Sequence, residues 1–221
     1  MSPIRPQHAV LRNLPVVLAL LAIGAIYTLV SERLAVGPRG LVPGLLVTLA
    51  VLLLAALGGG RWGLARAVGI VVLAVVTIAQ IVGASLLVAD LFTSAQRMAE
   101  ESRQMARSLF RDAALIWLVN ILTFALWYWE IDDGGPMRRH QAGYRDTDFI
   151  FPRPPPPTAA AAAPWVPHFV DYLFLAFTTS TAFSPTDTLV VSIRAKLLVM
   201  IQASTSLTVL TILAARAINS L

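Results

Sequence analysis

The sequence has no cysteine, few charged residues and no carboxylate at the centre of any long apolar segment. Without cysteine, the chain has no disulfides, thiolate metal sites or cysteine nucleophiles. Charged residues make up only 13% of the chain, and the basic ones are scattered instead of forming a stripe with interleaved aromatics. We therefore expect no nucleic acid partner. The lack of central carboxylates disfavours proton-coupled transport.

Groups for catalysis are also sparse. The three histidines, His8, His140 and His168, have no ligand-like spacing, so we predict no metal site. The chain has no glycine loop that would hold a phosphate, and we expect no cofactor. His168 and Asp171 form the only close histidine–carboxylate pair, which is more typical of a solvated interface. We therefore expect that the protein is not an enzyme.

Apolar residues are abundant: they make up 57% of the chain and cluster into segments too long for soluble core helices. The pattern predicts an all-α membrane protein with five transmembrane helices, at residues 14–30, 41–57, 67–91, 113–129 and 189–218. The preference for Arg over Lys, with much Ala, Val and Leu, is typical of a bacterial protein. We therefore expect a multi-pass protein of the bacterial inner (cytoplasmic) membrane.

Two polar segments separate these apolar ones. Residues 93–112 keep a helical spacing and carry four arginines, which predicts an amphipathic connector on the cytoplasmic side. Residues 131–167 contain the proline run 154–157, which favours polyproline II and predicts an extended or mobile surface loop. Tryptophans flank this loop, so we expect both its ends on one membrane face, outside together with the N-terminus. We divide the chain into regions 1–112 and 113–221.

The most informative feature lies in the last fifty residues or so. A short apolar helix, residues 169–177, runs into the hydroxyl-rich turn 178–187 and then into the last apolar segment. Such a helix cannot cross a bilayer that needs about 20 helical residues, but it can enter halfway and turn back. Irregular backbone at membrane depth persists only where protein or water satisfies its peptide groups. The pattern predicts a re-entrant or short half-helix near residues 168–180.

This order of elements resembles the pore domain of the potassium-channel superfamily. Residues 176–184 stand where those channels carry a Thr-Thr-Val-Gly-Tyr-Gly type filter, and Asp187 stands near their filter-end carboxylate. The resemblance covers the final quarter of the chain, or the final half if residues 113–129 are the outer helix. It implies a homo-oligomer, specifically a tetramer, that passes monovalent cations. Residues 125–130 and 182–187 also resemble an uncharacterised family of bacterial multi-pass membrane proteins, which implies no mechanism.

The chain departs from the channel pattern in one chemically important respect. No glycine occurs from Asp171 to Leu221, whereas a potassium filter needs glycines for its unusual backbone angles. We therefore predict a constriction lined by hydroxyls, with low selectivity among cations. A carboxylate near its mouth would concentrate cations. The predicted pore-lining residues are Thr178, Thr179, Ser180, Thr181, Ser184, Asp187, Gln202 and Ser206.

A non-conducting structural or partner-binding membrane protein is the alternative. Ser and Thr in membrane helices commonly bond to backbone carbonyls or to neighbouring helices. Residues 184–187 also have the composition of an ordinary helix start. Gln80, Asn120 and Gln202, near the middles of their segments, are candidates for interhelical hydrogen bonds. In this interpretation the region is only a tight helical hairpin, and the sequence leaves both interpretations open.

Overall fold

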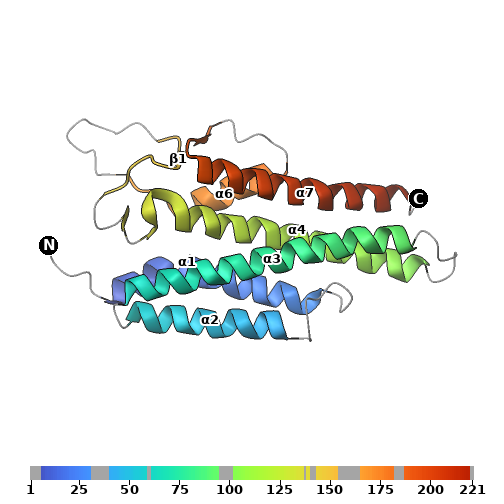
Figure 1. Ribbon diagram of the computed structural model, residues 1–221, viewed down its shortest axis with the longest axis horizontal. Helices are drawn as coiled ribbons and strands as arrows, with labels where there is room; N and C mark the ends of the chain where they lie inside the picture. The colour runs from blue at the N-terminus through green and yellow to red at the C-terminus, as the bar shows by residue number, and fades with distance from the viewer. Residues whose placement is uncertain are drawn as a thin grey trace.

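The computed structural model describes residues 6–30, 40–58, 61–94, 102–136, 138–139, 143–153, 165–181 and 187–219. Helices dominate these residues, and the long ones lie side by side (Figure 1). They are α1 (Pro6–Leu29), α2 (Leu41–Gly58), α3 (Trp62–Ser94), α4 (Ser102–Ile131), α6 (Phe169–Ser180) and α7 (Ile193–Asn219). Within the described ranges the only strands are β1 (Phe149–Ile150) and β2 (Leu189–Val190). The fold is therefore helical, as predicted.

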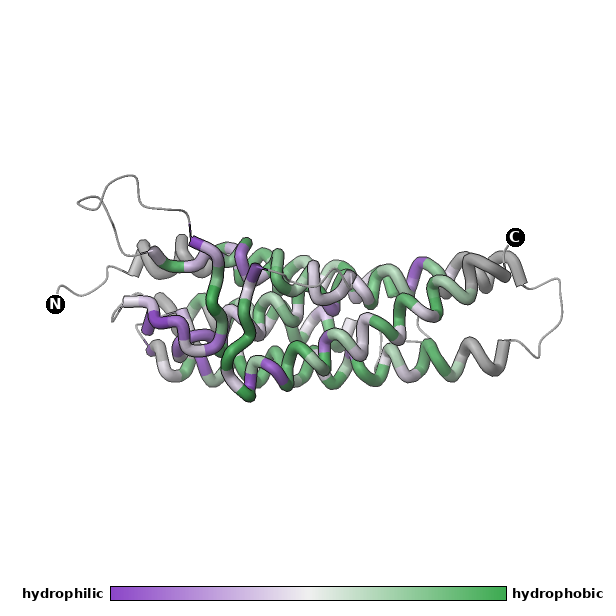
Figure 2. Tube along the Cα trace, turned by 90° about the horizontal axis from the view of Figure 1, so that it is seen from above, coloured by the Kyte–Doolittle hydropathy of each residue, from purple (hydrophilic) through white to green (hydrophobic). Residues whose placement is uncertain are grey.

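Three helical segments are long and apolar enough to cross a membrane: Arg66–Ala89, Phe110–Gly134 and Ile193–Ala215. The apolar parts of α1 and α2, Leu14–Leu29 and Leu41–Leu52, are shorter. The structure thus agrees with a membrane protein, whereas five separate spans stay a prediction. Figure 2 shows hydrophobic residues along the helices, with most hydrophilic residues gathered toward the end that carries the strands.

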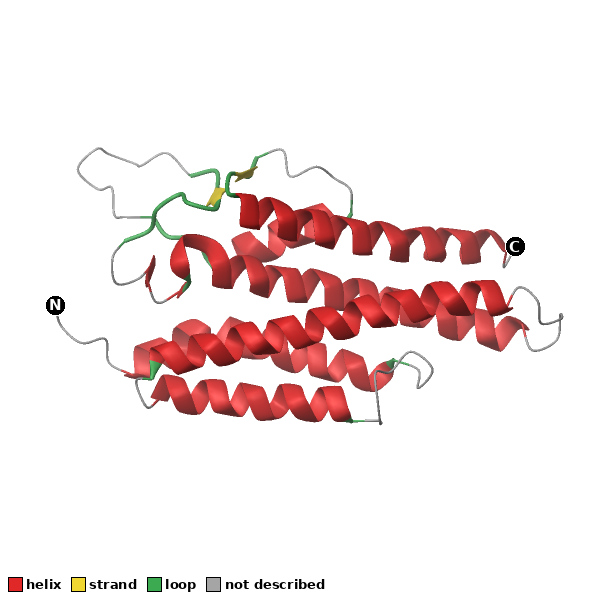
Figure 3. Ribbon diagram, viewed as in Figure 1, coloured by secondary structure: helices red, strands yellow, loops and turns green. Residues whose placement is uncertain are grey.

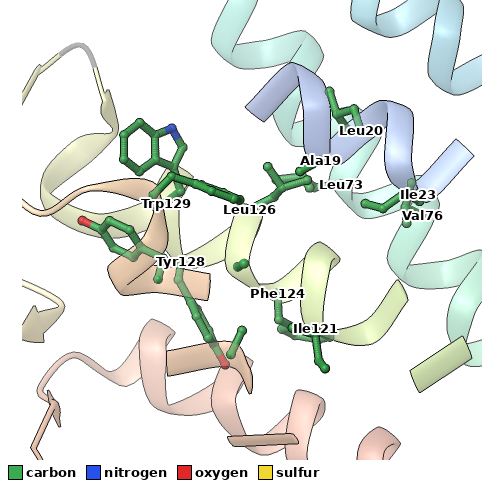
Figure 4. Packing of buried hydrophobic residues seen from close by; sticks show 14 of the residues in the cluster. Ala19, Leu20, Ile23, Leu73, Val76, Ile121, Phe124, Leu126, Tyr128 and Trp129 are labelled. Carbon is green, nitrogen blue, oxygen red and sulfur yellow. The ribbon is translucent and has the colours of Figure 1, made fainter. Parts of the chain in front are cut away.

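Helix α4 lies at the centre of the bundle and packs against α1, α3, α6 and α7. Ile23 of α1, Leu46 of α2, Val76 of α3 and Phe124 of α4 are each 2% exposed or less. They belong to one cluster of buried residues, part of which Figure 4 shows, that continues to α6 and α7. The regions predicted at 1–112 and 113–221 therefore share a core.

The helices α3 and α4 are longer than the spans predicted for them, at 33 and 30 residues. Helix α4 begins at Ser102 and runs without a break into the apolar segment. The second half of the predicted connector is therefore the first part of a long helix, because its helical spacing continues into the span. Residues 95–101 of the connector lie outside the described residues.

The described residues of the polar segment 131–167 form a folded cap, partly buried and partly exposed, which corrects for them the prediction of an extended or mobile loop. After α4 it forms the 3-10 turn η2 (Asp132–Gly134) and then β1 (Figure 3). Strand β1 pairs antiparallel with β2, with Phe149 opposite Val190. Arg139, Asp148 and Phe149 are 0% exposed. The polar composition was misleading because Arg139 and Asp148 form hydrogen bonds inside the cap. Prolines 154–157 lie outside the described residues.

Both ends of this segment lie at the same end of the bundle, whereas the membrane face on which they lie stays a prediction. The ring of Trp129, in the last turn of α4, meets the ring of Phe169, which opens α6, with centroids 5.9 Å apart.

The last helix begins later than predicted, at Ile193 instead of Leu189. Leu189 and Val190 form β2, and Ser192 Oγ then accepts the backbone N–H of Ala195 at 3.2 Å, which caps α7. The last helix therefore does not begin at Asp187, and residues 184–186 of the interpreted helix start lie outside the described residues. Pairing with β1 decides the conformation of this apolar stretch.

Candidate functional site

The C-terminal end of α6 lies deep beside α7. Gln202 Nε2 donates to Ser180 Oγ at 2.7 Å, and Ser206 Oγ donates to the Ser180 carbonyl at 2.7 Å. At about 1.5 Å per residue, these two α7 residues lie about 12 and 18 Å along the helix from Arg194. The last turn of α6 is therefore level with the middle of α7.

The segments before and after this point lie at the strand end of the molecule. Tyr172, in the first turn of α6, donates its hydroxyl to Asp132 Oδ2 at 2.5 Å. Leu189 pairs with Ile150 in the strand pair. Helix α6 thus runs beside α7, from the strand end of the molecule toward the middle of α7 (Figure 1). The chain has returned to the strand end by Leu189. The segment therefore goes to the middle of α7 and returns, whereas its half-way entry into a membrane stays a prediction.

Gln202 holds the end of α6 in place. Its side chain is 0% exposed, and its Nε2 donates to the Ala176 carbonyl as well as to Ser180 Oγ, both at 2.7 Å. Its Oε1 accepts the hydroxyl of Tyr128 on α4. One amide therefore joins α4, α6 and α7. A buried polar group left without a partner is costly, which gives this arrangement its specificity.

Neighbouring side chains extend the same network. Trp117 Nε1 of α4 donates to Ser206 Oγ at 3.1 Å, and Asn120 Nδ2 donates to the Gln202 carbonyl at 3.2 Å. Gln80 Nε2 of α3 donates to Asn120 Oδ1 at 2.5 Å. The interhelical hydrogen bonding predicted for Gln80, Asn120 and Gln202 is confirmed.

The hydroxyls of Thr178 and Thr181 bond to their own helix. Thr178 Oγ1 donates to the Phe174 carbonyl at 3.0 Å, and Thr181 Oγ1 donates to the Phe177 carbonyl at 3.1 Å. This back-bonding satisfies a hydroxyl on an apolar helix without any external ligand. Thr179 Oγ1 is buried and faces the Tyr128 side chain of α4.

The residues predicted to line a pore fall into separate groups. Ser180, Gln202 and Ser206 are at most 1% exposed and lie between α4, α6 and α7. Asp187 is exposed in the bend before β2, and Ser184 lies outside the described residues. Gln202 and Ser206 therefore act as interhelical contacts within one protomer. A pore-lining role for the remaining residues stays a prediction that depends on neighbouring copies.

Asp148 ties the start of α7 to the cap. Arg194 donates through Nε and Nη2 to its two carboxylate oxygens at 2.6 and 2.5 Å, and Ser192 Oγ donates to it at 2.5 Å. Thr147 Oγ1 adds a bond at 3.0 Å, and the Asp148 carbonyl accepts the N–H of Val191 at 2.9 Å. A bidentate arginine–carboxylate pair is directional, so it fixes where the chain re-enters α7.

The same contacts set the charge of Asp148. Burial alone would raise the pKa of its carboxyl group, but hydrogen bonds from Arg194, Ser192 and Thr147 to the charged form outweigh burial. They hold the pKa of Asp148 below its usual value, so the carboxylate stays ionised at neutral pH.

A buried arginine organises the rest of the cap, and sequence reasoning did not single it out. Arg139 Nη1 donates to the carbonyls of Trp129 and Asp132 at 2.8 and 2.7 Å. Its Cζ lies 4.5 Å from the centroid of the Trp129 ring and 5.3 Å from that of Tyr172, so the cation stacks on both rings. The only local signal was the aromatic run 127–129 just before two aspartates.

The His168–Asp171 pair is a helix cap. The backbone N–H of His168 donates to Asp171 Oδ2 at 2.6 Å, which fixes the first turn of α6. Among the described residues, no group of three or more His, Asp or Glu side chains could hold a metal ion. The groups around the end of α6 are amides, hydroxyls and carbonyls, which suit hydrogen bonding or weak coordination of a cation.

Comparison of the chain with family models, curated proteins and solved structures gave no match. A function for this protein therefore has to be argued from the geometry of the site itself.

Proposed function

We propose that the protein is a pore-loop, channel-like membrane protein that passes monovalent cations with low selectivity. In this proposal α1, α2, α3, α4 and α7 cross the inner membrane of a bacterium, and α6 enters it halfway. One protomer has a single re-entrant segment and cannot enclose a pore by itself. Copies of the chain, four by the resemblance to channels, place these segments around a common axis.

The observation that supports this proposal is the position of Ser180 beside the middle of α7. Helix α6 has 12 residues, or about 18 Å, which is well short of the ~30 Å hydrocarbon thickness of a bilayer. Its end lies beside Gln202 and Ser206, and the chain pairs with β1 again at Leu189. A polar turn placed at that depth is most stable beside water or protein.

The polar network has a supporting role in such a pore. Gln202 and Ser206 hold the end of α6 at its position along α7, and the Thr179 hydroxyl is buried inside the protomer. The lining therefore falls to Thr181 and the residues up to Ser184. Asp187 is exposed beside the strand pair, where a carboxylate raises the local concentration of cations. A lining without glycine favours low selectivity.

A non-conducting structural protein is the second candidate, and a specific observation favours it. Ser180, Gln202 and Ser206 are satisfied within one protomer, and the hydroxyls of Thr178 and Thr181 bond to their own helix. A hairpin with these groups already satisfied needs no water-filled axis. The two candidates differ in oligomeric state and in conduction.

Cation flux into liposomes containing the purified protein tests the first candidate. We expect flux with the wild type and about two- to fivefold less with Asp187→Asn at low ionic strength, with a smaller difference at high salt because salt screens the field. Asp146→Asn is the matched control. It removes the same charge from the cap, where Asp146 pairs with Arg153, and should leave flux unchanged.

The oligomeric state in detergent separates the candidates independently of flux. A closed homo-oligomer that conducts supports the pore. A monomer or dimer without flux supports the structural protein. Equal flux from the wild type and Asp187→Asn at low salt would contradict the assignment of Asp187 to the pore mouth.

A further inference from the structure

The cap contains an occupied cation site that the proposed function does not use. The guanidinium carbon of Arg153 lies 5.9 Å from the ring centroid of Tyr144 and 5.5 Å from that of Trp165. The two rings meet at a steep angle of 70°, with centroids 5.9 Å apart. Asp146 closes the site, since both its carboxylate oxygens accept Arg153 Nη2. We call Tyr144, Asp146, Arg153 and Trp165 the cation corner.

Two aromatic faces and a carboxylate form a general cation receptor. The negative faces of the rings attract a cation, and this combination suits quaternary ammonium groups. Here the occupant belongs to the chain itself. The Arg153 and Asp146 side chains are 45% and 32% exposed, and an exposed ion pair of this kind is weak because water competes for both partners. Another cation can therefore exchange with Arg153.

The corner lies close to the ends of the apolar helices. The ring centroid of Phe151 lies 6.3 Å from that of Trp165 and 5.0 Å from that of Tyr172. The centroids of Tyr172 and Trp129 are 5.5 Å apart. This stack of rings runs from the corner to the last turn of α4. Tryptophan and tyrosine gather where a membrane meets water, so the stack places the corner at headgroup level.

Exposed apolar side chains on and after the strand pair are a second, independent observation. Ile150 and its cross-strand partner Leu189 are 37% and 60% exposed. Val191 and Ile193, which follow β2, are 45% and 77% exposed. The strand pair thus offers an apolar surface on the face opposite to the buried Phe149 and Phe151. Acyl chains just below the headgroup level fit such a surface.

We propose that the cation corner is a headgroup site for a zwitterionic phospholipid. The lipid ammonium lies between Tyr144 and Trp165 and pairs with Asp146. Arg153 leaves the corner and pairs with the phosphate of the same lipid, which suits the planar guanidinium. Every charge keeps a partner in this exchange, and the acyl chains lie along Ile150 and Leu189. The site does not depend on whether the protein conducts.

Titration of the full chain with a short-chain phospholipid in an uncharged maltoside detergent tests this site. Dihexanoylphosphatidylcholine is compared with dihexanoylphosphatidylglycerol, which has the same chains and phosphate but no ammonium. The signal is the fluorescence of Trp165, taken as the difference between the wild type and Trp165→Phe, since the chain has 5 tryptophans. We expect saturation with the choline lipid and about tenfold weaker binding of the glycerol lipid, because the cation contacts are lost.

Three variants sharpen the result, each checked for unchanged melting temperature and elution profile. Asp146→Asn should weaken choline-lipid binding about tenfold through the lost charge pair. Arg145→Ala removes an exposed arginine outside the corner and should leave binding unchanged. Arg153→Ala removes the internal competitor, so tetramethylammonium alone should bind several-fold tighter than to the wild type, whereas the lipid loses its phosphate partner.

The lipid and its free headgroup are distinguished by soluble phosphocholine, which should bind more weakly than the lipid because it lacks acyl chains. Equal binding of the two would overturn the part assigned to Ile150 and Leu189. Equal titrations with the two lipids, or unchanged binding in Asp146→Asn, would overturn the headgroup site and leave Arg153 as a contact within the fold.

Discussion

Helices α1 and α2 meet through apolar side chains, whereas α4, α6 and α7 are joined by polar ones. In the first pair, the hydroxyls of Thr28 and Thr48 bond to carbonyls of their own helices. In the second group, Trp117 and Gln202 bond from one helix to another. Apolar contact between helices is little better than contact with lipid, but a hydrogen bond has one partner at one level. Polar contacts therefore determine how far α6 extends along α7.

The largest expected effect on this comparison comes from Gln202→Leu. The substitution leaves the Tyr128 hydroxyl without its acceptor and Ser180 without its donor, which costs about 1–3 kcal/mol and lowers the melting temperature in detergent. Thr205→Val is the matched control on α7, because that hydroxyl bonds only to the Ile201 carbonyl of its own helix. Equal losses from the two variants would contradict the distinction between the regions.

The next largest effect is the change in stability when either of two glycines is replaced by alanine. Gly135 has φ +97°, and a Cβ there would meet the Glu130 carbonyl oxygen at 3.2 Å, so Gly135→Ala should cost about 1–3 kcal/mol. A Cβ on Gly24, where α1 meets α2, would lie 3.9 Å from Leu46. Gly24→Ala should be neutral or stabilise by up to about 1 kcal/mol. Thermal unfolding of both variants checks this, and a greater loss at Gly24 would mean that α1 and α2 are the tightly specified pair.

The smallest effect concerns the cap and depends on pH. The pKa of Asp148 is lower in the folded protein than in the unfolded chain, so its stabilisation is present above the ordinary Asp value of about 3.9 and is lost as the pH falls through the folded value. Because the Arg194 side chain is 55% exposed, we expect about 1 kcal/mol. The melting curves of wild type and Asp148→Asn should differ at neutral pH and converge in acid. A gap that stays constant down to pH ~3 would contradict this assignment.

The long apolar helices and α6 could be predicted because their signals are local. An apolar stretch of limited length before a hydroxyl-rich turn indicated a short helix, and α6 extends only a few residues beyond the predicted 169–177. The interhelical role of Gln202 followed from a single amide in an apolar segment, which needs a partner at that depth.

The cap could not be predicted because its partners are far apart in the chain. Asp148 bonds to Arg194, 46 residues later, and Arg139 stacks on rings from α4 and α6. The polar composition of residues 131–167 is equally compatible with a solvated loop. Leu189 and Val190 are apolar in the manner of the helix that follows, and only pairing with β1 makes them a strand.

The depth of the end of α6 tests the central claim most directly. The chain has no cysteine, so single cysteines at Val170, Thr181 and Leu189 accept spin labels without any background substitution. Collision with oxygen and with a water-soluble nickel complex then reports the depth of each label in reconstituted protein. We expect residue 181 deep in the hydrocarbon, with 170 and 189 shallow at one face. Residue 181 at the same depth as 170, or residues 170 and 189 at opposite faces, would contradict a re-entrant segment.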